Sequence, residues 1–426
     1  MKRFVDELRW RGMLHDIMPE TEKLLEQGSV SGYIGFDPTA PSLGVGNLVQ
    51  IMTLLHFQRC GHKPVVVLGG ATGLVGDPSG KSQERNLLDK DRMNENLERQ
   101  KKQMEKFLDF GQGENAALLL NNYDWLKDFL FLDFIRDVGK HITVNYMLSK
   151  ESVQNRMATG ISFTEFSYQL IQGYDFYWLN KHKGIRLQMG GSDQWGNMVT
   201  GTELVRKISG ETAYALTTPL IKKADGTKFG KSESGNIWLD PELTSPYHFY
   251  QFWLNAADAD ISTFIRIFST RDREDIEALE AQHLQAPHLR MMQKALAEEI
   301  TIRVHSAEAL KRAIEASEIL FGKSTKEALN LLDDSQIQDV FRDVPRFEIP
   351  SSLLLPSVDV VSLLAEHTGI FPSKGEARRN LQANAVSINK EKIQIDVTIT
   401  EAHLLKGRFL IIQKGKKDYY LILVKQ

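Results

Sequence analysis

The sequence predicts an α/β protein whose core is a parallel, doubly wound sheet. Residues 30–36 form an apolar strand, and residues 64–69 (PVVVLG) form a continuous apolar run without alternation, typical of a strand buried on both faces of a parallel sheet. Each run ends in a glycine-bearing loop that leads towards a helix, and ligands gather at such junctions.

Composition limits the class of protein. The chain has 426 residues, 42% of them hydrophobic, and a net charge of -3, which suits two or three globular domains and excludes a globally basic nucleic-acid binder. Cys60 is the only cysteine, so the chain has no internal disulfide and no cysteine-based metal cluster. Because it lacks long apolar runs and a signal-peptide segment, we expect a soluble, cytoplasmic protein with no membrane partner.

The chain is organised around the segment 33–59, YIGFDPTAPSLGVGNLVQIMTLLHFQR. Its strand breaks at Asp37, and a turn over 42–47 leads into a helix predicted over 47–60. This arrangement brings the backbone and a helix N-terminus close to a phosphate. A glycine turn here is also common for packing alone, so the interpretation depends on a second element at 228–232.

The later elements follow in order. We predict an exposed helix over 89–110, a strand over 116–120, a mixed helical region over 129–147, a helix over 163–179, a strand over 186–190 and a helix continuing to 205. Apolar periodicity predicts helices from 244 to 322, and three prolines between 340 and 356 predict a linker. The segment 76–82 is not a P-loop, because only three residues separate its glycines.

Two patterns suggest a polar site. Tyr168, Gln172 and Asp175 lie at i, i+4 and i+7, so they project from one face of an otherwise apolar helix. Such a stripe is solvated, paired internally or part of a polar site. The segment 191–194 (GSDQ) is a second strand–glycine–helix junction.

The segment 216–240 carries a lysine-rich loop, KFGKS. Such loops are usually solvated surface, but Lys228, Lys231 and the hydroxyl of Ser232 are spaced to surround an anion such as a polyphosphate.

The last segment is basic. Residues 351–426 carry 11 Lys and Arg against 7 Asp and Glu, and 373–393 predicts a short basic helix, a turn and a strand. Clustered cations on a small α+β module are typical of nucleic-acid binding, whereas either half alone would suit a solvated face. The candidate RNA-binding cations are Lys374, Arg378, Arg379, Arg408, Lys414, Lys416 and Lys417.

Five segments in order carry a family resemblance: YIGFDPTAPSL, GGATGLVGDPSGKS, VNYMLSKESVQNRMATGISFTEFSYQLIQGYD, GGSDQWGN and KADGTKFGKS. They resemble bacterial-type tyrosyl-tRNA synthetase, a class I aminoacyl-tRNA synthetase. The likeness is dense to about residue 240 and returns at 351–426, which is similar to an αL-type RNA-binding module. It implies activation of tyrosine with ATP, Mg²⁺ travelling with the ATP, and transfer of the tyrosyl group to tRNA.

The resemblance also implies roles for individual residues. Tyr33 and Asp175 would bond the tyrosine phenol oxygen; Tyr168, Asp77 and Gln172 would hold its ammonium group, and Gln188 would also contact tyrosine. Asp37, Gly46, Gly191, Asp193 and Gln194 would contact ATP or the adenylate. Lys228, Lys231, Ser232 and Asn47 would act on the phosphates, with Lys81 and Arg85 on a loop that reaches pyrophosphate, and no protein metal ligand is implied.

The implied architecture is a Rossmann-like catalytic domain over 1–222 with a helical insertion at about 125–165, then a lysine-rich catalytic loop over 223–240. An α-helical domain over 241–325, a linker over 326–350 and a small α+β RNA-binding module over 351–426 follow. The resemblance implies a homodimer with the insertion at its interface.

One position departs from the family pattern. Where the class has His-x-Gly-His or a near variant, this chain has Gly44-Val45-Gly46-Asn47. Gly44 lacks a donor for the transition-state phosphates, and losing one such donor costs about 10²–10³ in rate. Either the rate is lower, another group substitutes, or residue 44 has been altered. Two rivals stay open: a catalytically silent RNA-binding relative, and a tryptophan-specific sister enzyme that the Tyr33 and Asp175 pair disfavours.

Overall fold

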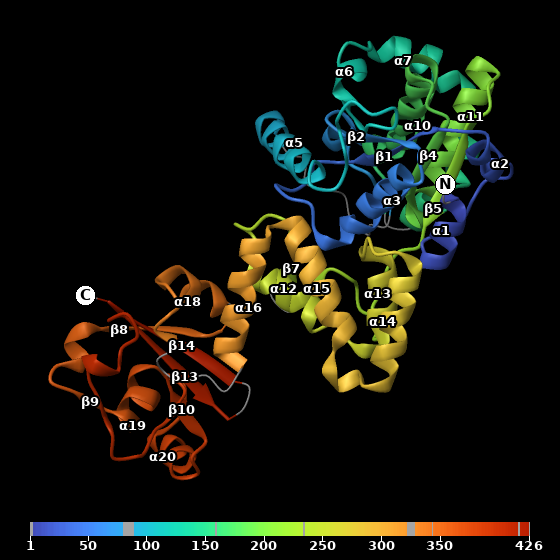
Figure 1. Cartoon of the computed structure of the whole chain (residues 1–426). Coiled ribbons are helices and arrows are strands. Elements are labelled where there is room, and N and C mark those ends of the chain that lie inside the picture. The colour runs from blue at the N-terminus through green and yellow to red at the C-terminus, as the bar shows by residue number, and fades with distance from the viewer. Residues whose placement is uncertain are drawn as a thin grey trace. The chain divides into compact units, whose positions relative to one another are not determined.

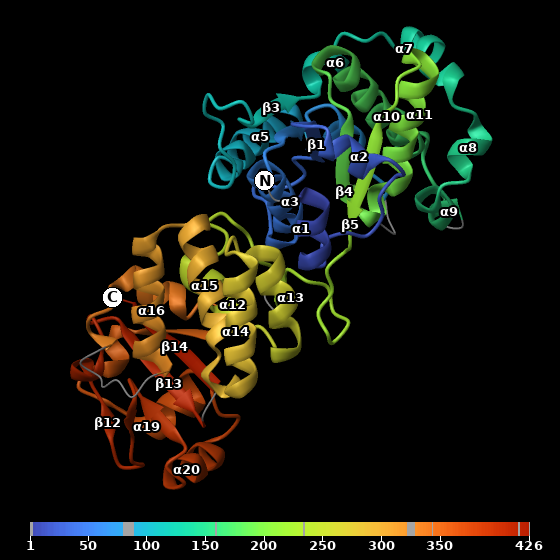
Figure 2. The ribbon, with the colours of Figure 1, turned by 45° about the vertical axis from the view of Figure 1, so that its right-hand side comes forward.

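The computed structural model describes residues 3–79, 89–157, 160–232, 235–321, 329–342, 344–415 and 418–425. The chain forms two compact units. The first comprises Met1–Thr244 and Phe252–Val304, and the second Ser245–Gln251 and His305–Gln426. Figures 1 and 2 show the chain coloured from the N-terminus to the C-terminus.

The first unit is built on a five-stranded sheet in which every strand pair is parallel, as the sequence predicts. Its strands are β1 (Ser31–Phe36), β2 (Lys63–Leu68), β3 (Leu118–Asn121), β4 (Leu187–Gly191) and β5 (Tyr214–Thr218). Their order is β3-β2-β1-β4-β5, so the chain reverses its direction of travel between β1 and β4. This reversal creates a crevice at the carboxyl ends of β1 and β4, where open α/β sheets bind ligands.

A helix leaves the sheet on each side of this reversal. A short 3₁₀ turn, Val45–Asn47, precedes α3 (Leu48–Arg59), which packs on β1 and β2. A second 3₁₀ turn, Ser192–Gln194, precedes α11 (Trp195–Ser209), which packs on β4 and β5. Because such crossovers are right-handed, these helices cover opposite faces of the sheet (Figure 1).

The helix that carries the polar stripe is α10 (Phe163–Lys183), four residues longer than predicted. It ends at Gly184, whose φ of +65° suits glycine. Glycines also let α10 lie close to α11: a Cβ added at Gly201 would come within 2.9 Å of the Phe176 side chain. This packing fixes the stripe beside the start of α11.

The other elements of the first unit surround this core or extend from it. They are α1 (Phe4–Arg11), α2 (Thr21–Glu26), α4 (Thr72–Val75), α5 (Lys90–Met104), α6 (Tyr123–Leu126), α7 (Phe131–Asp137), α8 (Val144–Leu148), α9 (Glu151–Met157), β6 (Lys231–Ser232), β7 (Gly235–Asn236), α13 (Asp258–Phe268), α14 (Arg273–Gln285) and α15 (Met291–Val304). The helix α12 (Pro246–Leu254) belongs partly to each unit.

The second unit contains a five-stranded sheet in the order β11-β10-β13-β14-β8 and a two-stranded sheet, β12-β9. Its elements are α16 (Ala307–Phe321), α18 (Asp334–Val340), β8 (Arg346–Pro350), β9 (Val358–Asp359), α19 (Val360–Ser362), α20 (Lys374–Gln382), β10 (Val386–Ile388), β11 (Glu391–Lys392), β12 (Thr398–Ile399), β13 (Phe409–Lys414) and β14 (Asp418–Lys425). Its core includes Leu363, Phe371, Leu410 and Ile422.

The segment 326–350, predicted to be a linker, instead contains α18 and β8 among its described residues. The strand β8 pairs in parallel with β14, and Ile349 is buried in the core of the second unit. The prolines misled the prediction because Pro345 precedes β8 and Pro350 ends it, and an edge strand tolerates proline at its ends. The helices predicted as one domain at 241–325 divide between the two units, because Ser245–Gln251 and the residues after Val304 belong to the second unit.

In the described part of the chain, every helix is too short or too polar to cross a membrane.

Candidate active site

A cavity of about 750 Å³ lies at the carboxyl edge of the first sheet, a volume usual for a small-molecule site. It collects polar residues that are far apart in the chain, from Tyr33 to Asn236. Among its lining residues are Tyr33, Asp37, Gly46, Asn47, Asp77, Tyr168, Gln172, Asp175, Gln188, Gly191, Asp193, Gln194, Lys228 and Lys231, all predicted as site residues.

Tyr33 and Gln188 lie directly opposite each other on β1 and β4, where the sheet order reverses. Both side chains are buried, and neither the Tyr33 hydroxyl nor Gln188 Oε1 has a hydrogen-bond partner among the described residues. A buried polar atom in this situation needs a partner from solvent or a ligand. Burial, and then the nearby charge of Asp175, raise the pKa of Tyr33 well above its usual value, so its hydroxyl keeps its proton.

Asp175 is buried, and two side chains fix its carboxylate. Asn122 Nδ2 donates to Oδ2 at 2.9 Å, and Trp125 Nε1 donates to Oδ1 at 2.8 Å. Burial raises the pKa of Asp175 to about 7, although these two hydrogen bonds act in the opposite direction. The carboxylate therefore changes its charge near neutral pH.

A chain of hydrogen bonds connects Asp175 to the end of β1. Asn122 Nδ2 also donates to Thr72 Oγ1 at 2.9 Å, and the Thr72 hydroxyl donates to Asp37 Oδ1 at 2.7 Å. The Tyr168 hydroxyl donates to the other Asp37 oxygen at 2.9 Å. Asp37 thus fixes the hydroxyl of Tyr168, the first residue of the polar stripe on α10.

Sequence reasoning missed Asn122, Trp125 and Thr72. A signal existed for Asn122, because it directly follows β3 and so lies at the same carboxyl edge as the other site residues. Hydrogen bonds at both amide atoms fix the orientation of the Asn122 side chain: Nδ2 donates to Asp175, and Oδ1 accepts from Ala71 N at 2.7 Å.

A second polar group joins the start of α11 to the rest of the stripe. Gln194 Nε2 donates to Asp77 Oδ2 at 2.7 Å, and Asn197 Nδ2 donates to Gln172 Oε1 at 2.9 Å. Asp193 is close enough to Asp77 that burial and then the Asp77 charge raise its pKa. The predicted amino-acid and nucleotide residues are therefore in direct contact.

The turn at 44–47 packs against the segment that follows the lysine loop. Val45 N donates to Ile237 O at 2.9 Å, and Asn47 Oδ1 accepts from Gly44 N at 3.0 Å. This bond leaves the Asn47 amide nitrogen as the donor end of the side chain. Lys228 and Lys231 are exposed at the cavity, while Lys81, Arg85 and the Ser232 side chain lie outside the described part of the structure.

The predicted RNA-binding cations that the structure describes divide into two groups. Arg378 and Arg379 are exposed on α20. Three others are in ion pairs: Lys374 with Glu366 at 2.8 Å, Arg408 with Asp334 at 3.1 Å, and Lys414 with Glu376 at 3.4 Å. Lys416 and Lys417 lie outside the described residues.

Among the described residues, no group of three or more His, Cys, Asp or Glu side chains could hold a metal ion.

Comparisons with known proteins show the family to which this chain belongs. A family model described as tRNA synthetases class I (W and Y) matches residues 25–322, and a model of the tyrosine–tRNA ligase SYY-like C-terminal domain matches 336–422. The tyrosine–tRNA ligase of Porphyromonas gingivalis is 58% identical over 99% of this chain and 100% of its own length. This chain belongs to the tyrosine–tRNA ligase family. The ligase of Cytophaga hutchinsonii is also 58% identical, over 99% of both chains.

Solved structures extend the likeness to the fold of this tyrosine–tRNA ligase. A C-terminally truncated mitochondrial tyrosyl-tRNA synthetase of Aspergillus nidulans is 30% identical, with a TM-score of 0.68. The match covers 75% of this chain and 95% of that one. The class I synthetase fold is thus common to both, and the tryptophan-specific rival is not favoured by relatives that match over the full length.

Proposed function

We propose that this ligase activates L-tyrosine with ATP to form tyrosyl-adenylate, releases pyrophosphate, and then transfers the tyrosyl group to its tRNA with release of AMP. The observation that carries this proposal is the Tyr33 and Asp175 pair, which shares one cavity with Lys228 and Lys231. A buried site for an aromatic hydroxyl thus lies beside cations suited to a triphosphate.

The phenol of tyrosine would bond to Tyr33 and Asp175. Tyr33 keeps its proton and can donate, whereas the ionised Asp175 can only accept. Phenylalanine would leave both buried groups without a partner, and a site of this kind rejects such an analogue strongly.

The amino-acid and nucleotide groups would occupy the two hydrogen-bonded sets described above. Tyr168, Asp77 and Gln172 would hold the ammonium group, with Gln188 beside the substrate. Asp37, Gly46, Gly191, Asp193 and Gln194 would contact ATP and the adenylate. The direct Gln194–Asp77 bond of 2.7 Å supports this assignment, because it brings the two sets together where the carboxylate must meet the α-phosphate.

Catalysis would consist of positioning and electrostatic stabilisation without a covalent enzyme intermediate. Lys228, Lys231, Ser232 and the Asn47 amide would bind the phosphates as charge moves onto pyrophosphate, assisted by Lys81 and Arg85. Mg²⁺ would arrive with ATP, bound by phosphate oxygens and water.

Gly44 would lower the rate of activation, because this position offers no side-chain donor to the phosphates. The rival interpretation, a silent RNA-binding relative, predicts loss of the pocket residues. Tyr33, Asp175 and both lysines are retained around one cavity, which favours an active enzyme.

The second unit would bind tRNA through the exposed Arg378 and Arg379, with the ion-paired cations as a further source of positive charge. A homodimer would form through the helical insertion. Its support is a series of large apolar side chains in this region that are at least 45% exposed: Leu130, Phe131, Leu132, Ile135, Val144, Met157 and Phe163. A cytoplasmic location fits this role in translation.

Exchange of labelled pyrophosphate into ATP, measured with tyrosine, phenylalanine or tryptophan, tests the proposal. We expect exchange with tyrosine alone. Exchange that depends on tryptophan would assign the chain to the sister specificity, and no exchange even after Gly44→His would support the RNA-binding relative.

A further inference from the structure

The lysine loop begins as a tight hairpin. Lys222 and Lys228 face each other as bridge partners, and Lys223 N donates to Thr227 O at 3.0 Å. Both Lys228 and Lys231 are exposed, whereas Phe229 between them is only 4% exposed. Phe229 therefore attaches the loop to the protein interior between its two exposed lysines.

Phe229 inserts among aromatic rings from α12 and α13. Its ring centroid lies 4.9 Å from that of Phe264 and 5.9 Å from that of Trp253. It stacks on Phe268 at 5.2 Å with an interplanar angle of 15°. All three partners are buried, so the position of Phe229 is determined by packing on several sides.

The hairpin turn has a second attachment to the same helix. Asp260 Oδ1 accepts a hydrogen bond from Ala224 N at 2.7 Å, and Asp260 is itself buried. Asp260, Phe264 and Phe268 are spaced four residues apart on α13, so they lie on one face of the helix. We call these three residues the loop seat.

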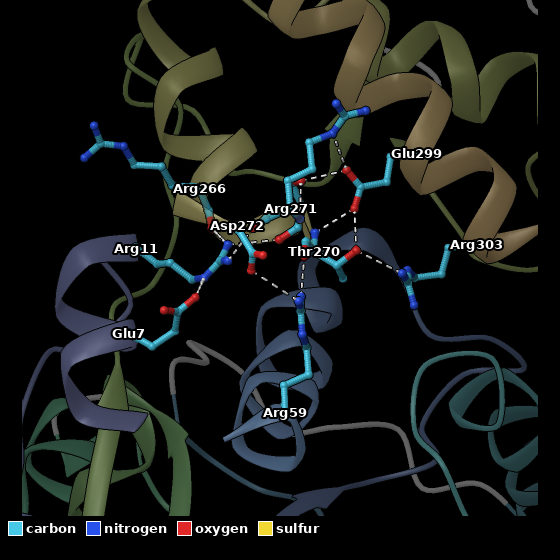
Figure 3. A network of polar contacts seen from close by, with 10 residues as sticks. Glu7, Arg11, Arg59, Arg266, Thr270, Arg271, Asp272, Glu299 and Arg303 are labelled. Carbon is cyan, nitrogen blue, oxygen red and sulfur yellow. Dashed lines mark hydrogen bonds and ion pairs between the residues drawn. The ribbon is translucent and has the colours of Figure 1, made fainter. Parts of the chain in front are cut away.

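The end of α13 is in turn fixed to the sheet domain (Figure 3). Arg11 from α1 is 1% exposed and donates to the carbonyl oxygens of Arg266 and Ser269, the latter at 2.9 Å. Arg59, the last residue of α3, donates to Thr270 O. Glu299 of α15 accepts from Thr270 N at 2.6 Å.

The helix α3 therefore connects the turn that lines the cavity with the helix that carries the loop seat. Its amino end follows the 45–47 turn that lines the cavity, and its carboxyl end contacts the segment after α13. These contacts fix the position of the loop seat relative to Asn47, while the two lysines lie on an exposed segment.

We propose that the loop seat positions Lys228 and Lys231 for the phosphates, with Phe229 and Asp260 as positioning residues. This inference rests on the proposed role of the two lysines in tyrosine activation. Loss of either attachment releases the lysines without altering the tyrosine pocket. Because a misplacement of 1 Å can cost about 10²-fold in rate, we expect Phe229→Leu to lower kcat of pyrophosphate exchange by roughly 10- to 100-fold, with KM for tyrosine unchanged.

Two controls separate positioning from general damage. Phe4→Leu removes an equally buried ring that packs on Phe57 and His62, and it should leave kcat near the wild-type value despite a similar fall in melting temperature. Asp260→Asn keeps an acceptor for Ala224 N, whereas Asp260→Leu removes it. We expect the Asn variant to resemble the wild type and the Leu variant to resemble Phe229→Leu.

A double-mutant cycle with Lys231→Ala decides whether Phe229 acts through the lysines. If it does, Phe229→Leu should cost less activity in the Lys231→Ala background than in the wild type, because it then misplaces Lys228 alone instead of both lysines. Full additivity, or an unchanged kcat for Phe229→Leu alone, would overturn the inference. If Lys231→Ala itself leaves exchange unchanged, the proposed role of the lysines fails instead, and the two failures are thus distinguishable.

Discussion

Trp125 Nε1 lies 2.8 Å from Asp175 Oδ1 and donates a hydrogen bond to it. Trp125 comes from the segment after β3 and Asp175 from α10, so this bond forms only when the two elements pack. Together with Asn122, it presents the buried carboxylate in one orientation. The proposed recognition of the phenol would therefore depend on the residues that orient Asp175 as well as on Tyr33 and Asp175 themselves.

Replacing Trp125 by Phe should weaken tyrosine binding. The change removes one donor to a carboxylate, and hydrogen bonds to charged groups contribute about 1.5–3 kcal/mol. We expect a rise in the tyrosine dissociation constant of at least tenfold, measured by equilibrium dialysis. Trp178→Phe is the matched control, because the Trp178 ring stacks on Trp125 at 4.3 Å and its replacement keeps a ring in place. Equal losses in both variants would argue that stacking matters and the donor does not.

Tyrosine affinity should fall as the pH drops below about 7. Burial raises the pKa of Asp175 to about 7 in the free protein, and a donating phenol would lower it in the complex. Binding is then coupled to proton release between the two pKa values, so acid weakens it. Dissociation constants between pH 5 and 8 measure the effect. Asp175→Asn should remove the pH dependence, and a flat wild-type profile would contradict this prediction.

Asp175 should also make the free energy of unfolding depend on pH. Asp175 has a raised pKa in the folded state, so between pH 4 and 7 the folded chain holds a proton that the unfolded chain has released. The free energy of unfolding of the wild type should therefore fall, relative to Asp175→Asn, as the pH rises from 5 to 8. Denaturant unfolding of both proteins at each pH measures this difference, which should have the opposite sign to that of a carboxylate whose folded-state pKa is lowered by an ion pair.

Introducing a histidine at position 44 should raise the rate of exchange. The new donor can contribute about 10²–10³ in rate. An added Cβ would come within 3.2 Å of Ile237 O, so a small shift of that segment is needed. Gly44→Ala adds the Cβ without the donor and so measures the steric cost alone. No gain of Gly44→His over Gly44→Ala would indicate that another group already supplies the donor.

Removing Arg378 and Arg379 should separate activation from tRNA charging. The double alanine variant should keep tyrosine-dependent exchange and lose tRNA affinity, and the slope of log K against log salt should decrease by about 1 per lost phosphate contact. Lys311→Ala with Arg312→Ala removes two adjacent exposed cations from α16 and serves as the control. Equal weakening in both variants would point to a diffuse charge effect.

Charge in the helical insertion should disrupt the proposed dimer. Phe131 and Leu132 on α7 are 65% and 77% exposed, so Asp at both positions would bury unpaired charges in the proposed interface. We expect a wild-type dimer and a monomeric variant in sedimentation velocity. Leu284→Asp changes a residue on α14 that is 79% exposed and should leave the dimer intact. A monomeric wild type would contradict the proposed assembly.

Much of the sheet domain could be predicted because its sequence signals are local. The buried strand at 64–69 lacks alternation, and the stripe at 168, 172 and 175 follows helical periodicity. The structure places β2 over Lys63–Leu68 and all three stripe residues on α10. The parallel order followed from the same signals, since strands that alternate with helices favour a parallel sheet.

The remaining features depend on contacts that no local pattern encodes. Asn122 and Trp125 are 53 and 50 residues from Asp175 in sequence, and only the packing of β3 beside β2 brings them to it. The strand β8 was hidden because Pro345 and Pro350 mark its ends, and its partner β14 is about 70 residues later. The attachment of Ala224 to Asp260 is likewise a tertiary contact.

A crystal structure of the protein with bound tyrosine tests the central claim most directly. We predict that the phenol oxygen lies within hydrogen-bond distance of both the Tyr33 hydroxyl and the Asp175 carboxylate, with Asn122 and Trp125 still bonded to Asp175. Tyrosine bound elsewhere in the cavity, or with its phenol turned away from these two side chains, would contradict it.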